Sequence, residues 1–276
     1  DIVQKKANGE KIVVLTCYDY PSAIIMEAAN VDIIFVGDSV GSNVLGYEST
    51  LFVTMEDILH HCKAVRRGVK NALFLADMPY MSYHVSQEQA VENAGRLVKE
   101  AGVEAVKLEG GVEIAPTIRR IVQAGIPVMG HIGMMPQHVL STGGFKVMGK
   151  TEADKLRLIA AAEAIQEAGA FAITLELVNH ETAEQISKAI EIPTIGIGSG
   201  SNCDGQVQVF HDLVGYYSGT PFKHAAKHAR TYDTFKNSVE QYVRDRFNIK
   251  FAHDDERAME FVIGCIPIHV MDARCV

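Results

Sequence analysis

The chain has 276 residues, of which 47% are hydrophobic, so it can bury a large core and lacks the polar bias of disordered segments. Its net charge of −8 argues against nucleic-acid binding, which usually requires a basic surface. Its five cysteines include no C-x-x-C pair, which argues against a disulfide framework or a zinc site and favours reduced thiols.

The longest apolar runs are too short to cross a bilayer, which takes about 20 residues. We therefore expect no membrane association and a cytoplasmic location. An organelle is the alternative, because the chain begins at Asp1 and a targeting segment can precede it.

Short β-branched runs alternate with longer amphipathic stretches, which predicts repeated β/α units. Most of the runs are almost continuously apolar, as is typical of parallel strands covered on both faces. The predicted strands are residues 11–18, 31–38, 72–78, 105–109, 127–132, 171–177, 194–198 and 206–211.

Helical patterns lie between these strands, at residues 54–69, 86–101, 114–124, 151–168 and 182–189. Thr54 and Thr151 are predicted N-caps, because each has an Asp three residues further on. Glycines follow four of the helical patterns, where a left-handed C-cap favours this residue. These predicted C-caps are Gly68, Gly102, Gly125 and Gly169.

Eight such alternations in a chain of this length predict a (β/α)8 TIM barrel, formed as a single domain over residues 1–276. A doubly wound open sheet is the rival fold, and its dinucleotide-binding version carries G-x-G-x-x-G after the first strand. Here the first predicted strand ends in Thr16-Cys17-Tyr18 and leads to Asp19, without a glycine loop. We therefore expect the closed barrel.

Charged or polar residues close five of the predicted strands. They are Asp38, Asp77, Lys107 with Glu109, His131, and Glu176. In a barrel these ends face one rim, where active sites lie. An isolated carboxylate is costly to bury without a partner, so several at one rim indicate a shared cation. Any one Asp could instead cap the next helix, but capping does not explain the whole set together with Lys107.

Oxygen ligands favour Mg²⁺, or alternatively Mn²⁺, over zinc. The predicted ligands are Asp38, Asp77 and Glu109. A 2-oxo acid would add two oxygens, and the metal would stabilise the enolate formed when a proton leaves the adjacent carbon. Glu176 is then the predicted base. Lys107 and His131 would supply positive charge or hydrogen bonds to the oxyanion.

Seven sequence motifs surround these residues in chain order. They are VGDSVG (36–41) with GY (46–47), ADMPY (76–80), VKLEGG (106–111), GHIG (130–133) with PQ (136–137), GGFKV (143–147) with GK (149–150), PTIGIG (193–198), and DGQ (204–206) with HD (211–212). Each motif alone is weak. Together they make the chain, from about residue 11 to about residue 215, resemble the ketopantoate hydroxymethyltransferase family.

The resemblance implies an enzyme of pantothenate biosynthesis that transfers a hydroxymethyl group from the cosubstrate 5,10-methylenetetrahydrofolate to 3-methyl-2-oxobutanoate, giving 2-dehydropantoate. The implied metal ligands are Asp38 and Asp77, with Glu109 as a third, directly or through water. The implied contacts to the oxo acid are Ser39, Lys107 and His131, together with the two metal-binding aspartates. Glu176 matches the family's proton acceptor. Family members are commonly homo-oligomers, often decamers, so an assembly of this kind is expected.

The chain departs from the family pattern after Gly215, and the segment 216–276 matches no pattern of the family beyond a faint likeness at 221–223. Two alternatives stay open. One is a 2-oxo acid enzyme of the phosphoenolpyruvate mutase and isocitrate lyase group, although the Lys-Cys-Gly-His-like loop of the lyases is absent from the sequence. The other is a degenerate homologue that only binds ligand or assembles, although every predicted ligand and the predicted base are present.

Overall fold

A computed structural model of the chain describes residues 1–144, 146–217 and 227–245. The chain divides into two compact units, Asp1–Ala229 and Arg230–Val276, and the described part of the second is Arg230 with helix α10 (Thr231–Asp245). Most of the divergent segment 216–276 therefore lies outside the described residues, and the single domain over 1–276 stays a prediction. Among the described helices, none combines the length and apolarity needed to span a membrane.

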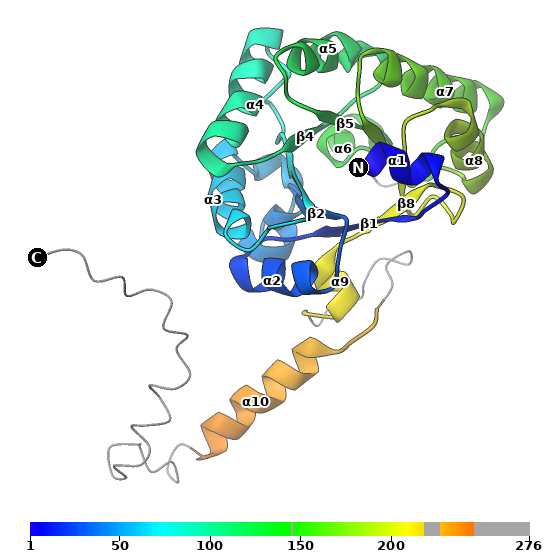
Figure 1. Cartoon of the computed structure of the whole chain (residues 1–276). Helices are drawn as coiled ribbons and strands as arrows, with labels where there is room; N and C mark the ends of the chain where they lie inside the picture. The colour runs from blue at the N-terminus through cyan, green and yellow to red at the C-terminus, as the bar shows by residue number, and fades with distance from the viewer. Residues whose placement is uncertain (145, 218–226, 246–276) are drawn as a thin grey trace, which may run out of the picture. The chain divides into compact units, whose positions relative to one another are not determined.

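The first unit is a closed barrel of eight parallel strands that pair in chain order, β1 to β8, and β8 pairs again with β1 (Figure 1). This confirms the predicted (β/α)8 fold. The strands are β1 (Ile12–Thr16), β2 (Ile33–Val36), β3 (Leu73–Asp77), β4 (Ala105–Glu109), β5 (Val128–Gly133), β6 (Ala172–Glu176), β7 (Thr194–Ile197) and β8 (Gly205–Gln208).

Helices surround the strands (Figure 1). The longer ones are α2 (Tyr20–Ala28), α3 (Met55–Arg66), α4 (Gln87–Ala101), α5 (Ala115–Gln123), α7 (Glu152–Glu167) and α8 (His180–Ala189). Short elements complete the unit: α1 (Ile2–Ala7), α6 (Val139–Thr142), α9 (Phe210–Val214), the π-helical turn η1 (Gly41–Leu45), and the 3-10 turns η2 (Thr50–Phe52), η3 (Val112–Ile114) and η4 (Pro136–His138).

The strand predicted at residues 206–211 is wrong at its C-terminal end. β8 stops at Gln208, and Phe210 and His211 open helix α9. The reason is a change of hydrogen-bond partner, because the Phe210 N–H donates to the Thr16 hydroxyl at 3.1 Å and not to the backbone ladder of β1. Helix α2 was not predicted, although the Asp19 side chain caps it and a proline stands in its first turn.

The predicted caps hold at all positions except Gly68. Thr54 and Thr151 accept hydrogen bonds as N-caps, and Gly102, Gly125 and Gly169 have positive φ at helix ends. Gly68 does not adopt the left-handed conformation. It serves a close approach instead, because a Cβ atom there would lie 2.7 Å from the Cβ of Ala23 on α2.

The barrel interior is filled by alternate residues of every strand. This inner cluster contains Ile12, Val14, Ile33, Phe35, Leu75, Ala105, Met129, Ala172, Ile195 and Val207. A larger apolar cluster lies between the strands and the helices. Because side chains alternate sides along a strand, the residue two places after each inner member also faces the interior. The inner cluster therefore determines which later residues of each strand can meet.

Helix α1 lies at the N-terminal ends of the strands, the side opposite to their carboxyl ends. Lys5 pairs with Asp32, just before β2, at 2.8 Å. The Lys6 ammonium group contacts the carbonyl oxygens of Ile190 and Ile192, just before β7, at 2.9 and 3.0 Å. Ile2 packs against the inner cluster from below. The helix thus ties β2 and β7 together across the floor of the barrel.

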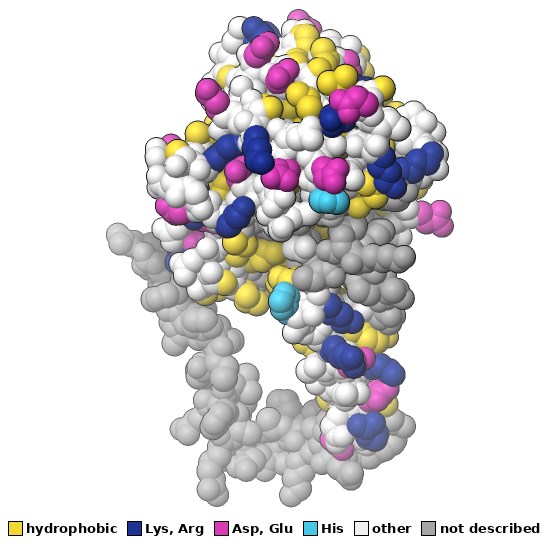
Figure 2. Space-filling model, turned by 90° about the vertical axis from the view of Figure 1, so that its right-hand side faces the viewer, with side chains coloured by type: hydrophobic (Ala, Val, Ile, Leu, Met, Phe, Trp, Pro, Cys, Tyr) yellow, Lys and Arg dark blue, Asp and Glu magenta, His cyan; other side chains and the backbone are white. Residues whose placement is uncertain are grey.

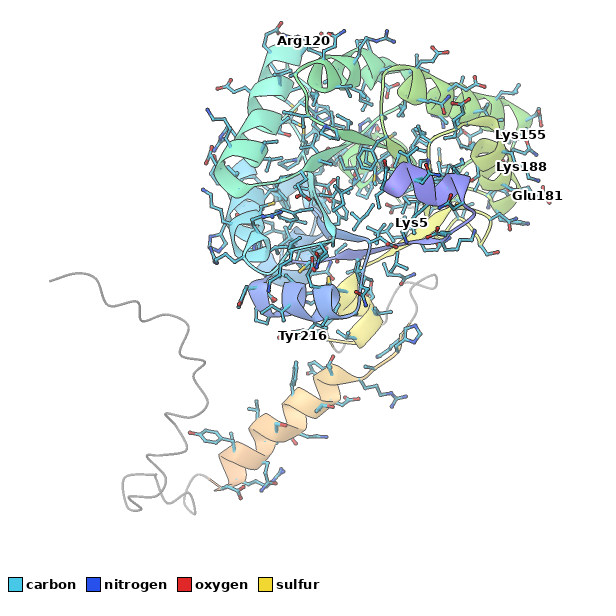
Figure 3. The ribbon with its side chains drawn as sticks, in the orientation of Figure 1. Lys5, Arg120, Lys155, Glu181, Lys188 and Tyr216 are labelled. Carbon is cyan, nitrogen blue, oxygen red and sulfur yellow. The ribbon has the colours of Figure 1, made fainter. Side chains whose placement is uncertain are left out.

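The outer surface is charged and mixed in sign. Figure 3 shows Lys155 on α7, and Glu181 and Lys188 on α8, projecting outward from the barrel. On the face that Figure 2 presents, acidic and basic side chains are interspersed among neutral ones.

Candidate active site

Four strands, β3 to β6, direct a polar residue into the barrel near their carboxyl ends, two residues beyond a member of the inner apolar cluster. Asp77 follows Leu75, Lys107 follows Ala105, His131 follows Met129, and Thr174 follows Ala172, each two residues later. Glu109 and Glu176 lie two residues further along β4 and β6. Strand pairing then places neighbours side by side, with Asp77 opposite Lys107, Glu109 opposite His131, and Glu176 opposite Gly133.

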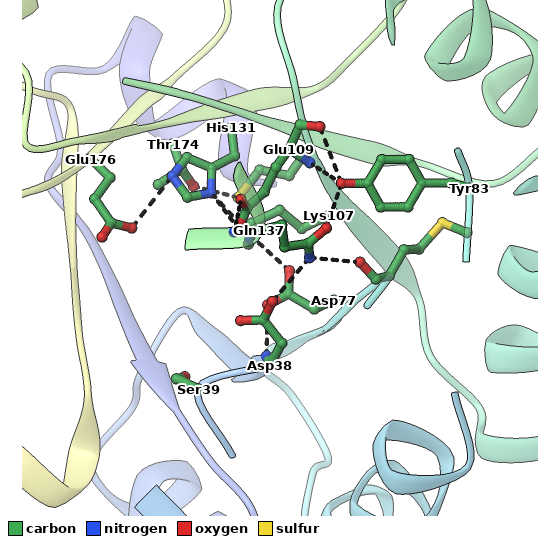
Figure 4. A network of polar contacts seen from close by, with 12 residues as sticks. Asp38, Ser39, Asp77, Tyr83, Lys107, Glu109, His131, Gln137, Thr174 and Glu176 are labelled. Carbon is green, nitrogen blue, oxygen red and sulfur yellow. Dashed lines mark hydrogen bonds and ion pairs between the residues drawn. The ribbon is translucent and has the colours of Figure 1, made fainter. Parts of the chain in front are cut away.

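A buried chain of charged contacts joins these side chains (Figure 4). The Lys107 ammonium lies 2.8 Å from Asp77 Oδ1, 3.1 Å from His131 Nδ1 and 3.9 Å from Glu109 Oε1. His131 Nδ1 lies 3.4 Å from Glu109 Oε1, and its Nε2 lies 3.4 Å from Glu176 Oε2. Among the described residues, His131 Nε2 has no hydrogen-bond partner although it is buried, so it can serve a ligand in the cavity.

Asp38 lies two residues after β2, where its backbone N–H donates to Asp77 Oδ2 at 2.8 Å. This bond holds the two aspartates next to each other. Ser39 follows, and its hydroxyl lies 2.8 Å from the hydroxyl of Tyr18, which is buried at the end of β1. The loop after β2 therefore carries both residues to the rim of the barrel.

The site contains more acidic than basic side chains, and burial together with the neighbouring charges shifts the pKa values of several of them. Burial, followed by the charges of Asp77 and Glu109, raises the pKa of Asp38 well above its ordinary value. Burial acts to lower the pKa of Lys107, but the three surrounding carboxylates outweigh it and raise that pKa. For His131, burial and Lys107 oppose protonation, yet Glu109 and Glu176 raise its pKa to about 9. A further cation would relieve the excess negative charge.

The donor set fits a hard divalent cation. Asp38, Asp77 and Glu109 offer carboxylate oxygens. Both oxygens of Asp77 and both oxygens of Glu109 also contact protein groups, whereas the side-chain hydrogen bond from Gln137 to Asp38 goes to Oδ2. Among the described residues, no three His, Cys, Asp or Glu side chains form a ready-made metal site. Mg²⁺ does not require one, because it usually takes one or two carboxylates and keeps waters or substrate oxygens as its other ligands.

Glu176 stands on a constrained stretch of backbone. Leu177, the next residue, has φ 47°, an uncommon conformation for a residue with a side chain. Two hydrogen bonds hold it, one from its N–H to Ile197 O at 2.9 Å and one to its carbonyl from the Met148 N–H at 2.8 Å. The end of β6 is thus held on both sides, and the Glu176 side chain, which is 15% exposed, lines the cavity beside His131.

All seven residues predicted from the sequence line one cavity of about 340 Å³ at the carboxyl ends of the strands. They are Asp38, Ser39, Asp77, Lys107, Glu109, His131 and Glu176. The floor of the cavity is apolar and belongs to the inner cluster, with Phe35, Leu75 and Val207 among its members. The structure therefore brings the whole predicted set together, while the role of each residue stays a prediction.

Two buried residues of the site received no role from the sequence. Gln137, within η4, contacts both Asp38 and Glu109, and Tyr83, in the loop before α4, contacts Gln137 and the backbone of Glu109. The Pro136-Gln137 motif drew attention to Gln137 without suggesting what it does. Nothing in the local sequence distinguishes Tyr83 from other loop residues.

The fold and the polar cavity at the carboxyl ends of its strands define a (β/α)8-barrel enzyme. The sequence model of the ketopantoate hydroxymethyltransferase family matches residues 1–254. The 3-methyl-2-oxobutanoate hydroxymethyltransferase of Dehalococcoides mccartyi strain CBDB1 is 53% identical over 88% of this chain and 87% of its own length. The protein of the same name from Syntrophus aciditrophicus is 50% identical over 91% and 92%. The chain belongs to the ketopantoate hydroxymethyltransferase family, and it is a transferase.

Solved structures share the fold at low identity. Phosphonopyruvate hydrolase in complex with oxalate and Mg²⁺ superposes with a TM-score of 0.60 at 12% identity, covering 95% of this chain and 92% of that one. The 2,3-dimethylmalate lyase of the PEP mutase/isocitrate lyase superfamily gives 0.59 at 17% identity, covering 95% and 93%. At these identities the likeness shows the fold alone.

Proposed function

We propose that this chain transfers a hydroxymethyl group from 5,10-methylenetetrahydrofolate to 3-methyl-2-oxobutanoate, giving 2-dehydropantoate. The observation that carries the proposal is the cavity itself, where Glu176 on β6 and the Asp38–Asp77 pair beside β2 and β3 line one space above an apolar floor. A small branched oxo acid needs this combination of an apolar surface for its carbon branch and polar groups for its two oxygenated carbons.

Mg²⁺, or Mn²⁺ in its place, would be held by Asp38 and Asp77, with Glu109 as a third ligand, directly or through water. When bound, this ion supplies Lewis-acid stabilisation of the negative charge that develops on the oxo acid. Lys107 and Ser39 bind and orient the substrate's polar end, and the ammonium group remains charged because carboxylates surround it. His131 Nε2, which lies 3.4 Å from Glu176 at the cavity, faces the same end of the substrate.

Glu176 takes the proton from C3 of the oxo acid. Water cleaves the methylene bridge of the folate, so that the one-carbon unit leaves as formaldehyde, and C3 adds to the formaldehyde carbon. The net transfer consumes one water, whose oxygen becomes the new hydroxyl group, and releases tetrahydrofolate. The hydrogen-bonded backbone around Leu177 holds the end of β6 in place, which keeps Glu176 at the cavity.

Proton NMR of 3-methyl-2-oxobutanoate in D2O tests both halves of the reaction. With protein and Mg²⁺ we expect loss of the C3 proton signal, and with tetrahydrofolate and formaldehyde we expect 2-dehydropantoate. Exchange of the C3 proton without formation of 2-dehydropantoate would support the enolising site but would contradict transfer from the folate. No exchange by folded, metal-loaded protein would favour a homologue that binds ligand without catalysis.

Substitution of the proposed base separates its role from that of the metal. Glu176→Gln should abolish C3 exchange, a loss of at least about 100-fold for a general base, while Mn²⁺ binding remains. Glu181→Gln is the matched control, because Glu181 is exposed at the start of α8 and projects outward (Figure 3). If Glu176→Gln exchanges the C3 proton as fast as Glu181→Gln does, Glu176 is not the base. Loss of Mn²⁺ binding in Asp38→Ala and Asp77→Ala would support the assigned ligands.

A further inference from the structure

We propose that Gln137 and Tyr83 form a positioning pair that aims the Asp38 carboxylate at its cation. The inference rests on the proposed function, since it assigns residues that support the metal-binding aspartates. Neither residue lines the cavity, and both are almost fully buried, with 2% and 3% exposure. They lie in different loops, Tyr83 between β3 and α4 and Gln137 after β5, and they meet behind Asp38 and Glu109 (Figure 4).

The side chain of Gln137 has one possible orientation. Its amide nitrogen donates to Asp38 Oδ2 at 2.9 Å and to the carbonyl oxygen of Met78 at 3.1 Å. Both of these partners only accept hydrogen bonds, so the amide NH2 group must face them. The amide oxygen then faces the Tyr83 hydroxyl, which donates to it at 2.7 Å. Rotation of the amide by 180° would bring three acceptors together, which keeps the group in place.

Tyr83 secures this orientation and links it to Glu109. Besides donating to Gln137, the Tyr83 hydroxyl accepts a hydrogen bond from the Glu109 backbone N–H at 3.1 Å. The Gln137 backbone N–H in turn donates to the Glu109 carboxylate at 3.0 Å. The pair therefore contacts two of the three predicted metal carboxylates, through buried hydrogen bonds that leave little freedom of movement.

An amide is suited to this place for an electrostatic reason. It satisfies one oxygen of a buried carboxylate without neutralising its charge, so Asp38 remains an anionic ligand. Among the described residues, the side-chain hydrogen bond to the Asp38 carboxylate goes to Oδ2. A lysine in the same position would compete with the cation, and an apolar residue would leave the carboxylate oxygen unsatisfied. Partners of this kind orient the ligands of metal sites, and their removal typically weakens binding by about 10–100-fold.

The test is the affinity for Mn²⁺ alone, measured from the EPR signal of free Mn²⁺ with full-length protein and no substrate. Tyr83→Phe and Gln137→Met should each raise the Kd by about 10-fold or more. The matched control is Gln166→Met, because the Gln166 amide oxygen also holds two backbone N–H groups, those of Glu191 and Ile192, away from the cavity. The control should lower thermal stability without a change in Kd.

A Kd within twofold of the wild type in folded Tyr83→Phe protein would overturn the proposal, as would wild-type protein that binds no Mn²⁺. Tyr83→Phe removes only one oxygen atom and is therefore the milder change. If Gln137→Met does not fold, the Kd of Tyr83→Phe still tests the proposal. The outcome is independent of turnover: protein that binds Mn²⁺ in the expected order, yet exchanges no C3 proton, would refute the proposed reaction and leave the positioning pair in place.

Discussion

Gly133→Ala provides a sharp test of how the site is built, because Gly133 touches the backbone of the proposed base. Gly133 ends β5 with φ 100° and pairs in register with Glu176 on β6. A Cβ atom at this position would lie 2.2 Å from the Glu176 carbonyl oxygen and 2.7 Å from Val178 Cγ2. The carbonyl cannot rotate away freely, because it accepts the Met134 N–H at 2.8 Å.

The expected cost has two parts. A positive φ for a residue with a side chain costs about 1–2 kcal/mol. Overpacking against atoms that must move adds about 1–3 kcal/mol. Gly125→Ala isolates the first part, since Gly125 has φ 87° and nothing within 4 Å of the added Cβ. The gain from a less flexible unfolded chain is common to both variants and cancels in the comparison. Gly133→Ala should therefore be less stable than Gly125→Ala by about 1–3 kcal/mol.

Urea unfolding followed by far-UV circular dichroism measures this difference, which suits a chain without tryptophan. Because the clash pushes on Glu176, Gly133→Ala should also slow C3 proton exchange, whereas Gly125→Ala should not. Equal unfolding free energies for the two variants, within about 0.5 kcal/mol, would refute the steric part of this reasoning.

Three further substitutions test the frame around the site. Lys6→Met removes the ammonium contacts to three carbonyl oxygens and to Asp204, so the unfolding free energy in urea should fall by about 2 kcal/mol, and an unchanged value would contradict a role in closing the barrel floor. Burial acts to raise the pKa of Glu27, but the backbone N–H groups of residues 70–72 outweigh it and lower that pKa. The resulting stabilisation is present above the ordinary value of 4.5 and lost as the pH falls through the lower folded value, so Glu27→Gln should flatten the acid limb of the stability curve. Thr54→Ala removes the capping box with Asp57 at the start of α3 and should cost about 1 kcal/mol, visible as a lower melting temperature.

The fold could be predicted from the sequence because its signals are local. Continuous apolar runs mark strands covered on both faces, and each observed strand overlaps a predicted one. Helix α2 was missed although its cap and proline are local signals. Two other predictions were wrong because a contact distant in sequence determines the local structure. Phe210 leaves the ladder because Thr16 offers it a hydroxyl, and Gly68 is needed because α2 passes close to it.

The members of the site could be predicted for a related reason. In a closed parallel barrel the carboxyl ends of all strands meet at one rim, and side chains alternate between the two faces of each strand. Polar residues such as Asp77, His131 and Glu176, two or four places after an inner apolar residue, therefore had to face a common cavity. Their residue types alone indicated oxygen ligands, a positive group and a base.

Only the tertiary structure decided how these groups are paired and supported. Tyr83 and Gln137 are 54 residues apart in the chain, yet they meet behind Asp38, which lies 99 residues before Gln137. The lengths and paths of three loops determine these contacts, and no periodicity encodes them. Strand pattern determined by itself which side chains reach the cavity. The hydrogen bonds that hold them in place depend on loop conformation, which becomes defined only when the barrel closes and its loops pack against one another.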